Sequence, residues 1–374
     1  AASDVYKRQI YIYLIPYLLL LSCQNTTYQE QVQCIDYDNL SNGDFIIKDI
    51  EYVPLETTDQ SLLGSIKKVL FKNNKFYILD TSENNGVYIF DRKGRFLSAI
   101  NKQGEAPDEY IELMDMDVDN EGNVYIADNA RMNLLKYNPS NSELQEIIHT
   151  GLHFFEFACL DTHSFLLRDV FDPKEAKAKL AYYDATSKKL EPILKSQTSA
   201  INEMSIMKCS KHYLYRSGNQ IYYNERFTPE IYSLSTEGKL TSAYSIHSDS
   251  YIQEDELKGM ENKPLKFIQE TTHIKDITCL YENETYFICA PFIVPSSKYV
   301  LIPKQSPQQT KIINLTDKKE FIGTSQIEGV AEDKFITILT PANASEEILS
   351  KEPLLKSLED DSNPVLVLFS IQSI

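Results

Sequence analysis

Phe76-Tyr77-Ile78-Leu79-Asp80 and Val124-Tyr125-Ile126-Ala127-Asp128 are two copies of one short apolar phrase that ends in aspartate. Each copy is followed by a polar gap and a second apolar run, which is Val87–Phe90 after the first and Leu134–Tyr137 after the second. Tyr125 follows Tyr77 by 48 residues. A period of about 40–50 residues built from short strands and turns is typical of a β-propeller blade, a four-stranded sheet repeated around an axis.

Fainter copies of the phrase continue to the C-terminus. They predict an all-β fold over residues 45–374, a six-bladed β-propeller of four-stranded antiparallel blades. The later blades are marked by Phe165–Arg168 and Leu180–Asp184, Gln220–Asn224 and Glu230–Leu234, Tyr286–Cys289 and Tyr299–Ile302, and Lys334–Leu339 and Val365–Phe369. Because an open ring would expose strand edges, we expect Phe45–Val53 to complete the last blade beside Pro364–Ile371.

Two charged segments lengthen the later blades. Ser250–Thr272 and Ala342–Asn363 contain leucines and isoleucines at helical spacing, so we expect short helical insertions on one rim. The composition fits an all-β chain, since Tyr (24) and Phe (17) are abundant. The net charge of −17 argues against binding to nucleic acid, whose phosphates would be repelled.

The N-terminus resembles a bacterial export signal. Ile10–Leu21 is apolar, follows Lys7 and Arg8, and is shorter than the roughly 20 residues that span a bilayer. It ends in Leu20-Leu21-Ser22-Cys23, which resembles a lipobox. We therefore predict a lipoprotein signal peptide over residues 1–22 and lipidation of Cys23; a non-lipidated signal with a chance cysteine is the alternative.

Residues 23–44 begin with a polar run and are expected to form a flexible tether between a membrane and the propeller. No run of acidic residues follows Cys23 directly. This favours the periplasmic face of the outer membrane over the cell surface.

Several of these segments together resemble a known family, the six-bladed β-propeller lipoproteins common in Bacteroidetes. They are Tyr52–Thr58, Tyr77–Asp80, Val87–Gly94, Gln103–Tyr110 and Asp361–Val367. Ala106 departs from the glycine that the family usually has before the proline. Asp119–Asn138 also looks like an NHL repeat, a module known mainly for binding partners. The resemblance implies the fold but supplies no catalytic residues.

The loop Gly104–Tyr110 is the candidate binding site, with Glu105, Asp108, Glu109 and Tyr110 as its residues. Its carboxylates would accept hydrogen bonds from a sugar or coordinate a cation at a channel mouth. Alternatively, the loop only fixes the passage between the first two blades.

Asp115-x-Asp117-x-Asp119 has the look of a calcium loop, but an EF-hand needs Gly at its sixth position and Glu at its twelfth. Asn120 and Ile126 stand there, so a strand followed by a turn is the favoured interpretation. No other metal or nucleophile motif is present in the sequence, and no metal or cofactor is predicted.

Cys279 and Cys289 flank Asn283-Glu284-Thr285 symmetrically, so a hairpin centred at Glu284 would set them opposite each other. In an oxidising compartment they could form a disulfide, and as buried apolar residues they need no bond. Both alternatives stay open.

The pattern as a whole favours a membrane-tethered, non-catalytic module that binds a protein or a glycan through one rim of the propeller. The alternative is a cation-dependent hydrolase or lyase whose site lies in the central channel. Three or more Asp, Glu, Asn or His side chains converging in the channel would favour the enzyme, whereas a dry or apolar channel would favour binding only.

Overall fold

The computed structural model of the protein describes residues 32–83, 85–171, 178–195, 212–235, 238–252, 273–274, 276–291, 298–318, 326–344 and 352–374. Residues 1–32 and 33–374 are separate units, and the second unit holds the propeller. The described residues begin at 32, so they do not include the predicted signal peptide, Cys23 or the start of the predicted tether. No helix in the described part of the chain is long and apolar enough to cross a membrane.

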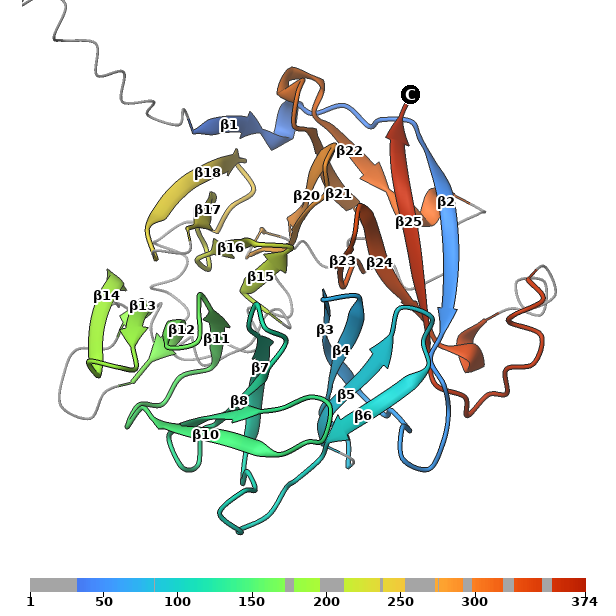
Figure 1. Cartoon of the computed structure of the whole chain (residues 1–374). Helices are drawn as coiled ribbons and strands as arrows, with labels where there is room; N and C mark the ends of the chain where they lie inside the picture. Colours follow the sequence, from blue (N-terminus) through green and yellow to red (C-terminus); the bar gives the residue numbers. More distant parts are fainter. Residues whose placement is uncertain are drawn as a thin grey trace, which may run out of the picture. The chain divides into compact units, whose positions relative to one another are not determined.

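Strands in the described residues form six sheets arranged in a ring, which confirms the predicted β-propeller (Figure 1). Blade 1 is β3 (Ile66–Lys72), β4 (Lys75–Asp80), β5 (Gly86–Asp91) and β6 (Phe96–Ile100). Blade 2 is β7 (Leu113–Val118), β8 (Val124–Asp128), β9 (Asn133–Tyr137) and β10 (Leu144–His149). Blade 3 is β11 (Glu156–Cys159), β12 (Ser164–Val170), β13 (Ala178–Asp184) and β14 (Lys189–Lys195).

The remaining blades follow the same order from the centre outward. Blade 4 is β15 (Leu214–Ser217), β16 (Gln220–Asn224), β17 (Glu230–Leu234) and β18 (Leu240–His247). Blade 5 is β19 (Ile277–Glu282), β20 (Tyr286–Pro291), β21 (Lys298–Pro303) and β22 (Lys311–Asn314). Blade 6 is β23 (Gly329–Ala331), β24 (Lys334–Leu339), β25 (Val365–Ser373) and the early strand β2 (Phe45–Pro54).

The repeated phrase is buried on both faces because each blade packs between two neighbours. Side chains alternate along a strand. In β4, Tyr77 and Leu79 pack with blade 2, whereas Phe76 and Ile78 pack with blade 6. Two-sided burial explains why the phrase reads as a continuous apolar run.

The aspartate that ends each copy of the phrase has a structural role. Asp80 accepts hydrogen bonds from the backbone N–H groups of Gly64 (2.5 Å) and Ser65 (3.1 Å), just before the inner strand of its own blade. Asp128 does the same for Ile111 (3.2 Å) and Glu112 (3.1 Å). Each aspartate therefore anchors the entry of the chain into a blade, which is why it recurs with the strand.

The ring closes as predicted. β2 pairs antiparallel with β25, from Phe45 opposite Ser373 to Pro54 opposite Val365. The last blade thus combines strands from both ends of the propeller, and the pairing removes two open sheet edges.

Residues 33–44, the later part of the predicted tether over 23–44, belong to the propeller and are not a flexible linker. β1 (Gln33–Asp36) pairs parallel with β18 as a fifth strand of blade 4. Gly43 N–H then donates to Ile312 O (2.8 Å), and Ile312 N–H donates to Ser41 O (3.0 Å), at the edge of blade 5. Residues 33–54, here called the N-terminal belt, therefore pair in turn with blades 4, 5 and 6 (Figure 1). The sequence analysis missed this because a four-residue strand between polar residues has no clear periodicity.

The predicted helical insertions are not borne out in the described residues, whose helices are four single 3-10 turns. They are η1 (Tyr37–Asn39), η2 (Pro307–Gln309), η3 (Leu315–Asp317) and η4 (Pro341–Asn343). The described part of Ala342–Asn363 forms consecutive turns, in which Leu355 is buried against blade 6 and Leu354 is exposed. Leu355 and the partly buried Leu358 pack against the same core, so in the described turns this spacing is satisfied without a helix. Residues 253–272 lie outside the described part.

Candidate functional site

Charged side chains from neighbouring blades meet at the centre of the ring. The innermost strands β3, β7, β11 and β15 surround the axis and carry all but one of them, and the remaining residue, Arg168, lies on β12 (Figure 1). We call this set of side chains the channel cluster. Its members are Lys68, Asp115, Asp117, Glu156, Arg168 and Arg216.

Lys68 of blade 1 and Asp115 of blade 2 form a buried ion pair. Lys68 Nζ lies 3.1 and 3.2 Å from the two carboxylate oxygens of Asp115, and it also donates to Met116 O (2.8 Å). Burial by itself would lower the pKa of Lys68, but the nearby carboxylates, Asp115 first, outweigh burial and raise it. The lysine is therefore held in its charged form.

Asp117 joins three blades. Its carboxylate accepts from Arg216 Nη2 of blade 4 (2.5 Å) and Nε (3.2 Å), and from the Cys159 N–H of blade 3 (2.7 Å). Arg216 also donates to Cys159 O (2.8 Å). Burial opposes ionisation of Asp117, yet Arg216 and Lys68 lower its pKa overall.

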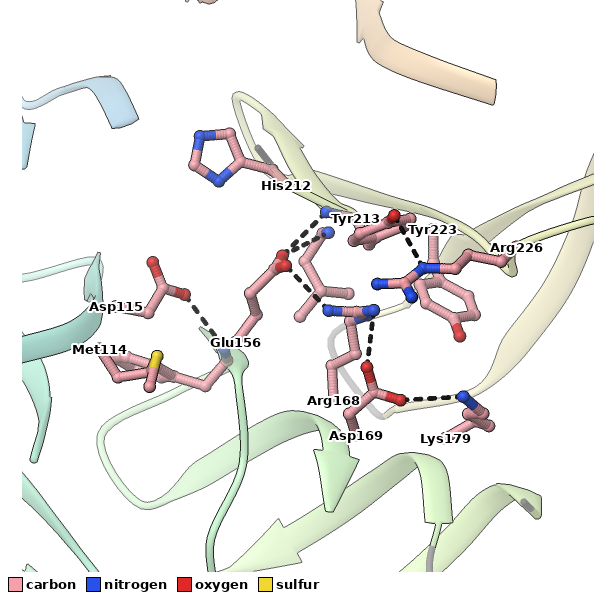
Figure 2. Close-up of polar contacts among 12 residues, drawn as sticks. Met114, Asp115, Glu156, Arg168, Asp169, Lys179, His212, Tyr213, Tyr223 and Arg226 are labelled. Atoms are coloured by element: carbon pink, nitrogen blue, oxygen red, sulfur yellow. Dashed lines mark hydrogen bonds and ion pairs between the residues drawn. The ribbon is translucent and has the colours of Figure 1, made fainter. Parts of the chain in front are cut away.

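Glu156 of β11 binds both an arginine of its own blade and the backbone of the next blade. It accepts from Arg168 Nη1 (3.0 Å) and from the backbone N–H groups of Tyr213 (2.9 Å) and Leu214 (3.0 Å), as Figure 2 shows. Burial would raise the pKa of Glu156, but Arg168, His212 and the backbone donors lower it to about 2. This carboxylate therefore fastens blade 3 to the start of blade 4.

Two arginines enclose Tyr213. Arg168 lies 4.0 Å and Arg226 lies 4.6 Å from the centre of its ring, both at cation–π distance. Arg226 Nε also donates to Tyr213 Oη (2.8 Å), and Arg168 pairs with Asp169 (2.7 Å), which in turn pairs with Lys179 (3.2 Å) (Figure 2). We call Arg168, Tyr213 and Arg226 the arginine–tyrosine stack.

His212 links opposite sides of the ring. Its Nε2 is bonded to the backbone carbonyl of Lys67, which joins blade 4 to blade 1. Burial lowers the pKa of His212 to about 3, so the ring is neutral near pH 7. A neutral, buried imidazole bonded to a backbone group suits a structural role.

The chemical capacity of the channel cluster follows from this pairing. Asp115, Asp117 and Glu156 each bind a cationic side chain and at least one backbone N–H. Within the part of the chain that the structure describes, no three His, Cys, Asp or Glu side chains are grouped to hold a metal ion. The cluster ties blades 1–4 together electrostatically.

The predicted binding loop lies between β6 and β7, and its polar groups are partly used to hold its shape. Glu109 Oε2 accepts from Ala106 N–H (2.8 Å), and Asp108 pairs with Lys102 (2.9 Å). Tyr110 is buried and donates to Asn85 O (2.8 Å). Glu105 and Asp108 are exposed. In the described part of the chain, the side-chain hydrogen bonds and ion pairs of these four residues do not reach the channel cluster.

Arg131 fixes the backbone of this loop. Its guanidinium donates to the carbonyl oxygens of Glu105 (2.7 Å), Ala106 (3.2 Å) and Glu109 (2.6 Å). Ala106 does not have a positive φ, so this position of the loop does not require a glycine. The loop presents its exposed carboxylates from a constrained backbone.

The aspartates at 115, 117 and 119 follow the strand-turn interpretation. Asp115 and Asp117 lie two residues apart on β7 and face the centre. Asp119 opens the next turn, where its Oδ1 accepts from the N–H groups of Glu121 (3.0 Å) and Asn123 (2.8 Å). The three side chains therefore serve different neighbours.

Cys279 and Cys289 are both buried. The hairpin is not symmetric, because the register shifts between the pairs Thr278–Ala290 and Tyr281–Ile288. Cys279 lies in this irregularity with a φ of 54°. The symmetric pairing expected from the sequence is therefore absent from this part of the hairpin, and the disulfide between Cys279 and Cys289 stays a prediction.

Sequence reasoning missed most of the channel cluster. Lys68, Arg168 and Arg216 each interrupt or end an apolar strand segment, and a charge in that position was the available signal. Their partners could not be named, because Lys68 and Asp115 are 47 residues apart and Asp117 and Arg216 are 99 apart.

Comparison with known proteins supports the fold. A crystal structure of a predicted exported protein from Bacteroides fragilis is similar over 91% of this chain and 99% of its own, at 18% identity and a TM-score of 0.69. A DUF4221 family member from Bacteroides vulgatus is similar over 90% and 100%, at 12% identity and a TM-score of 0.54. No curated protein sequence matches. The family described as domain of unknown function DUF4934 matches residues 29–370, and the chain belongs to this family.

Proposed function

We propose that the protein is an exported, membrane-tethered propeller that binds a protein or glycan ligand without catalysing a reaction. The observation that carries the proposal is that the carboxylates at the centre of the ring are already hydrogen-bonded to other groups of the protein. A catalytic acid, base or cation ligand needs a group with free bonding capacity facing the substrate. The carboxylates of the channel cluster are instead bonded to cations and backbone N–H groups of neighbouring blades.

The loop Gly104–Tyr110 offers the features that binding requires. Arg131 holds three of its carbonyl oxygens, so little conformational entropy is lost when a ligand binds. Glu105 and Asp108 remain exposed on this constrained loop and can accept hydrogen bonds from sugar hydroxyls or from a basic protein surface. Glu109 and Tyr110 hold the shape of the loop, because Glu109 accepts from Ala106 N–H and Tyr110 donates to Asn85 O.

Export and tethering rest on the N-terminal sequence. Lys7, Arg8, the apolar run Ile10–Leu21 and Cys23 form the pattern of a lipoprotein signal. The similar Bacteroides fragilis protein is described as exported, which agrees with this part of the proposal. We place the lipid on Cys23 and the propeller at the periplasmic face of the outer membrane. Metabolic labelling with a palmitate analogue should mark the wild type and not Cys23→Ala; equal labelling of both would refute lipidation.

The binding proposal is tested with the double variant Glu105→Gln/Asp108→Asn. A glycan array and cross-linking to outer-membrane proteins would identify ligands of the wild type, and titration would then give affinities. The double variant should bind at least tenfold more weakly with an unchanged melting temperature. The matched control is Glu121→Gln/Glu143→Gln, which removes two exposed carboxylates elsewhere on blade 2. Equal affinity of the two double variants would contradict the assignment of the loop.

The enzyme alternative predicts a different result. If the channel cluster bound a catalytic cation, Asp117→Asn would abolish both metal content and turnover of a bound glycan. Under the binding proposal, the wild type leaves that glycan intact whether or not divalent cations are added.

A further inference from the structure

Asp276 is a buried carboxyl group at the junction of blades 4 and 5. It immediately precedes β19 and has no exposed surface. The N–H of its neighbour Ile277 donates to Asn224 Oδ1 of blade 4 (3.0 Å). The backbone that carries Asp276 is therefore fixed between the two blades, and the side chain cannot reach water.

The bonding of this carboxyl is incomplete. Its Oδ2 accepts from Tyr213 Oη (3.3 Å), while Oδ1 has no hydrogen-bond partner in the described part of the chain. Tyr213 Oη in turn accepts from Arg226 Nε (2.8 Å). A charge on Asp276 is thus stabilised through the tyrosine hydroxyl rather than by a direct ion pair, in contrast to the carboxylates of the channel cluster.

The surrounding charges favour a neutral Asp276. The residues that face it or its immediate neighbours come from every element packed around the junction. They are Glu156 of β11, Arg168 and Asp169 of β12, Lys179 of β13, Tyr213 before β15, Glu225 and Arg226 after β16, and Tyr251 after β18. Three of these are cations and three are carboxylates, so an ionised Asp276 adds a fourth negative charge to a balanced set.

Burial raises the pKa of Asp276 to about 6, and Arg226 and the Tyr213 hydroxyl oppose this increase without cancelling it. An aspartate in an unfolded chain has a pKa of about 3.9. Between these values the folded protein holds a proton that the unfolded chain has released, so folding becomes weaker as pH rises through this window. Above the upper value, both states are ionised and the effect is constant.

We propose that Asp276 is a proton-binding site whose neutral form locks the junction of blades 3, 4 and 5 around the arginine–tyrosine stack. Proton loss leaves an uncompensated buried charge beside Tyr213 and weakens the junction. The propeller is therefore held more firmly in a mildly acidic medium than in a neutral one. This is a conformational property of the fold and does not depend on the proposed ligand.

The test compares the pH dependence of unfolding in wild type and Asp276→Asn, by urea titration from pH 4.5 to pH 7.5. Asparagine keeps the shape and cannot ionise. The unfolding equilibrium constant of the wild type relative to the variant should rise about 25-fold between pH 4.5 and pH 7.5, because this range covers most of the window from about 3.9 to about 6, and it should level off above that window. The surface variant Asp59→Asn, at an exposed residue outside the loop and the junction, should leave the wild-type profile unchanged. Parallel profiles of wild type and Asp276→Asn would overturn the proposal.

Two further variants keep the proposal testable if Asp276→Asn does not fold. Glu225→Gln removes a nearby carboxylate that raises the pKa of Asp276, so the transition in the wild-type background should move to lower pH. Arg226→Gln removes a nearby cation, so the transition should move to higher pH. If both variants changed overall stability but left the position of the transition unmoved, Asp276 would not be the titrating group.

Discussion

Blades 1–3 and blades 4–6 are built from the same strand order but are held together differently. In blades 1–3 every strand comes from a local run of hairpins. In blades 4–6 the N-terminal belt adds an edge strand or bridge to each blade, across more than 200 residues of sequence. One continuous apolar core covers both faces of blade 5, where it meets blades 4 and 6, whereas a separate core lies at each of the other interfaces between blades.

The difference shows where each half of the ring obtains its cohesion. The first half depends on local hairpins and on the channel cluster, which links its inner strands by ion pairs. Both halves have apolar packing between blades, and the second half adds the belt. Substitutions in the two halves should therefore differ in size and in their response to pH and salt.

The largest effect is expected from loss of the belt's apolar anchor. Phe45 is almost fully buried in the core of blades 4–6, and Lys318 lies 4.7 Å from its ring centre. Phe45→Ala should lower the free energy of unfolding by about 3–5 kcal/mol. The matched control is Phe96→Ala on β6, a partly exposed phenylalanine on the outer strand of blade 1. Chemical denaturation measures both, and an equal loss would remove the distinction between the two halves.

The next effect concerns the ion-paired centre. Glu156→Gln weakens the pairing of Arg168 and two backbone bonds, and should cost about 3 kcal/mol near pH 7. The lowered pKa of Glu156 means that its contribution is present above about pH 4.3 and is lost as pH falls toward about 2. Urea titrations at pH 7 and pH 3 should therefore show a smaller difference between variant and wild type at the lower pH. A constant difference would contradict the ionic role.

A smaller effect is expected where the two halves meet. Asn363 accepts from Leu63 N–H (2.8 Å) and donates to Glu56 O and Ser61 O (both 2.8 Å), so it fastens the loop that leads from the belt into blade 1. Asn363→Ala should cost about 2 kcal/mol because it leaves buried backbone groups unpaired. Hydrogen exchange of Leu63 should become faster, while exchange in blade 3 should stay as in the wild type.

The smallest effect is expected from the ion pair on the surface of the same junction. Arg92 donates to both oxygens of Glu51 (2.8 Å each) and reaches Glu332 (3.1 Å). Arg92→Lys keeps the charge but loses the bidentate hydrogen bonding to Glu51, so it should lower the free energy of unfolding by about 0.5–1 kcal/mol. The melting temperature of Arg92→Lys should be lower than that of the wild type in low salt, and the two melting temperatures should converge in high salt. A difference that persisted in high salt would assign Arg92 a packing role.

The sequence by itself determined the blade period, the six blades and the closing pair of β2 and β25. The blade period and the number of blades depend on contacts between strands that are neighbours in the chain, and on the alternation that places Phe76 and Tyr77 on opposite faces. The closing pair follows from the need to cover the strand edges at the two ends of the ring. The aspartates at 115 and 117 were noticed for their spacing, but the spacing did not reveal their cationic partners.

Only the tertiary structure decided the path of residues 33–44 and the composition of the centre. A four-residue parallel strand such as β1 is stabilised by the edge of β18 that it meets, and not by its own pattern. Likewise, Asp117 and Arg216 lie on blades 2 and 4, so their contact depends on the diameter of the closed ring. The burial of Asp276 follows from the same packing, because only the assembled blades exclude water from its side chain.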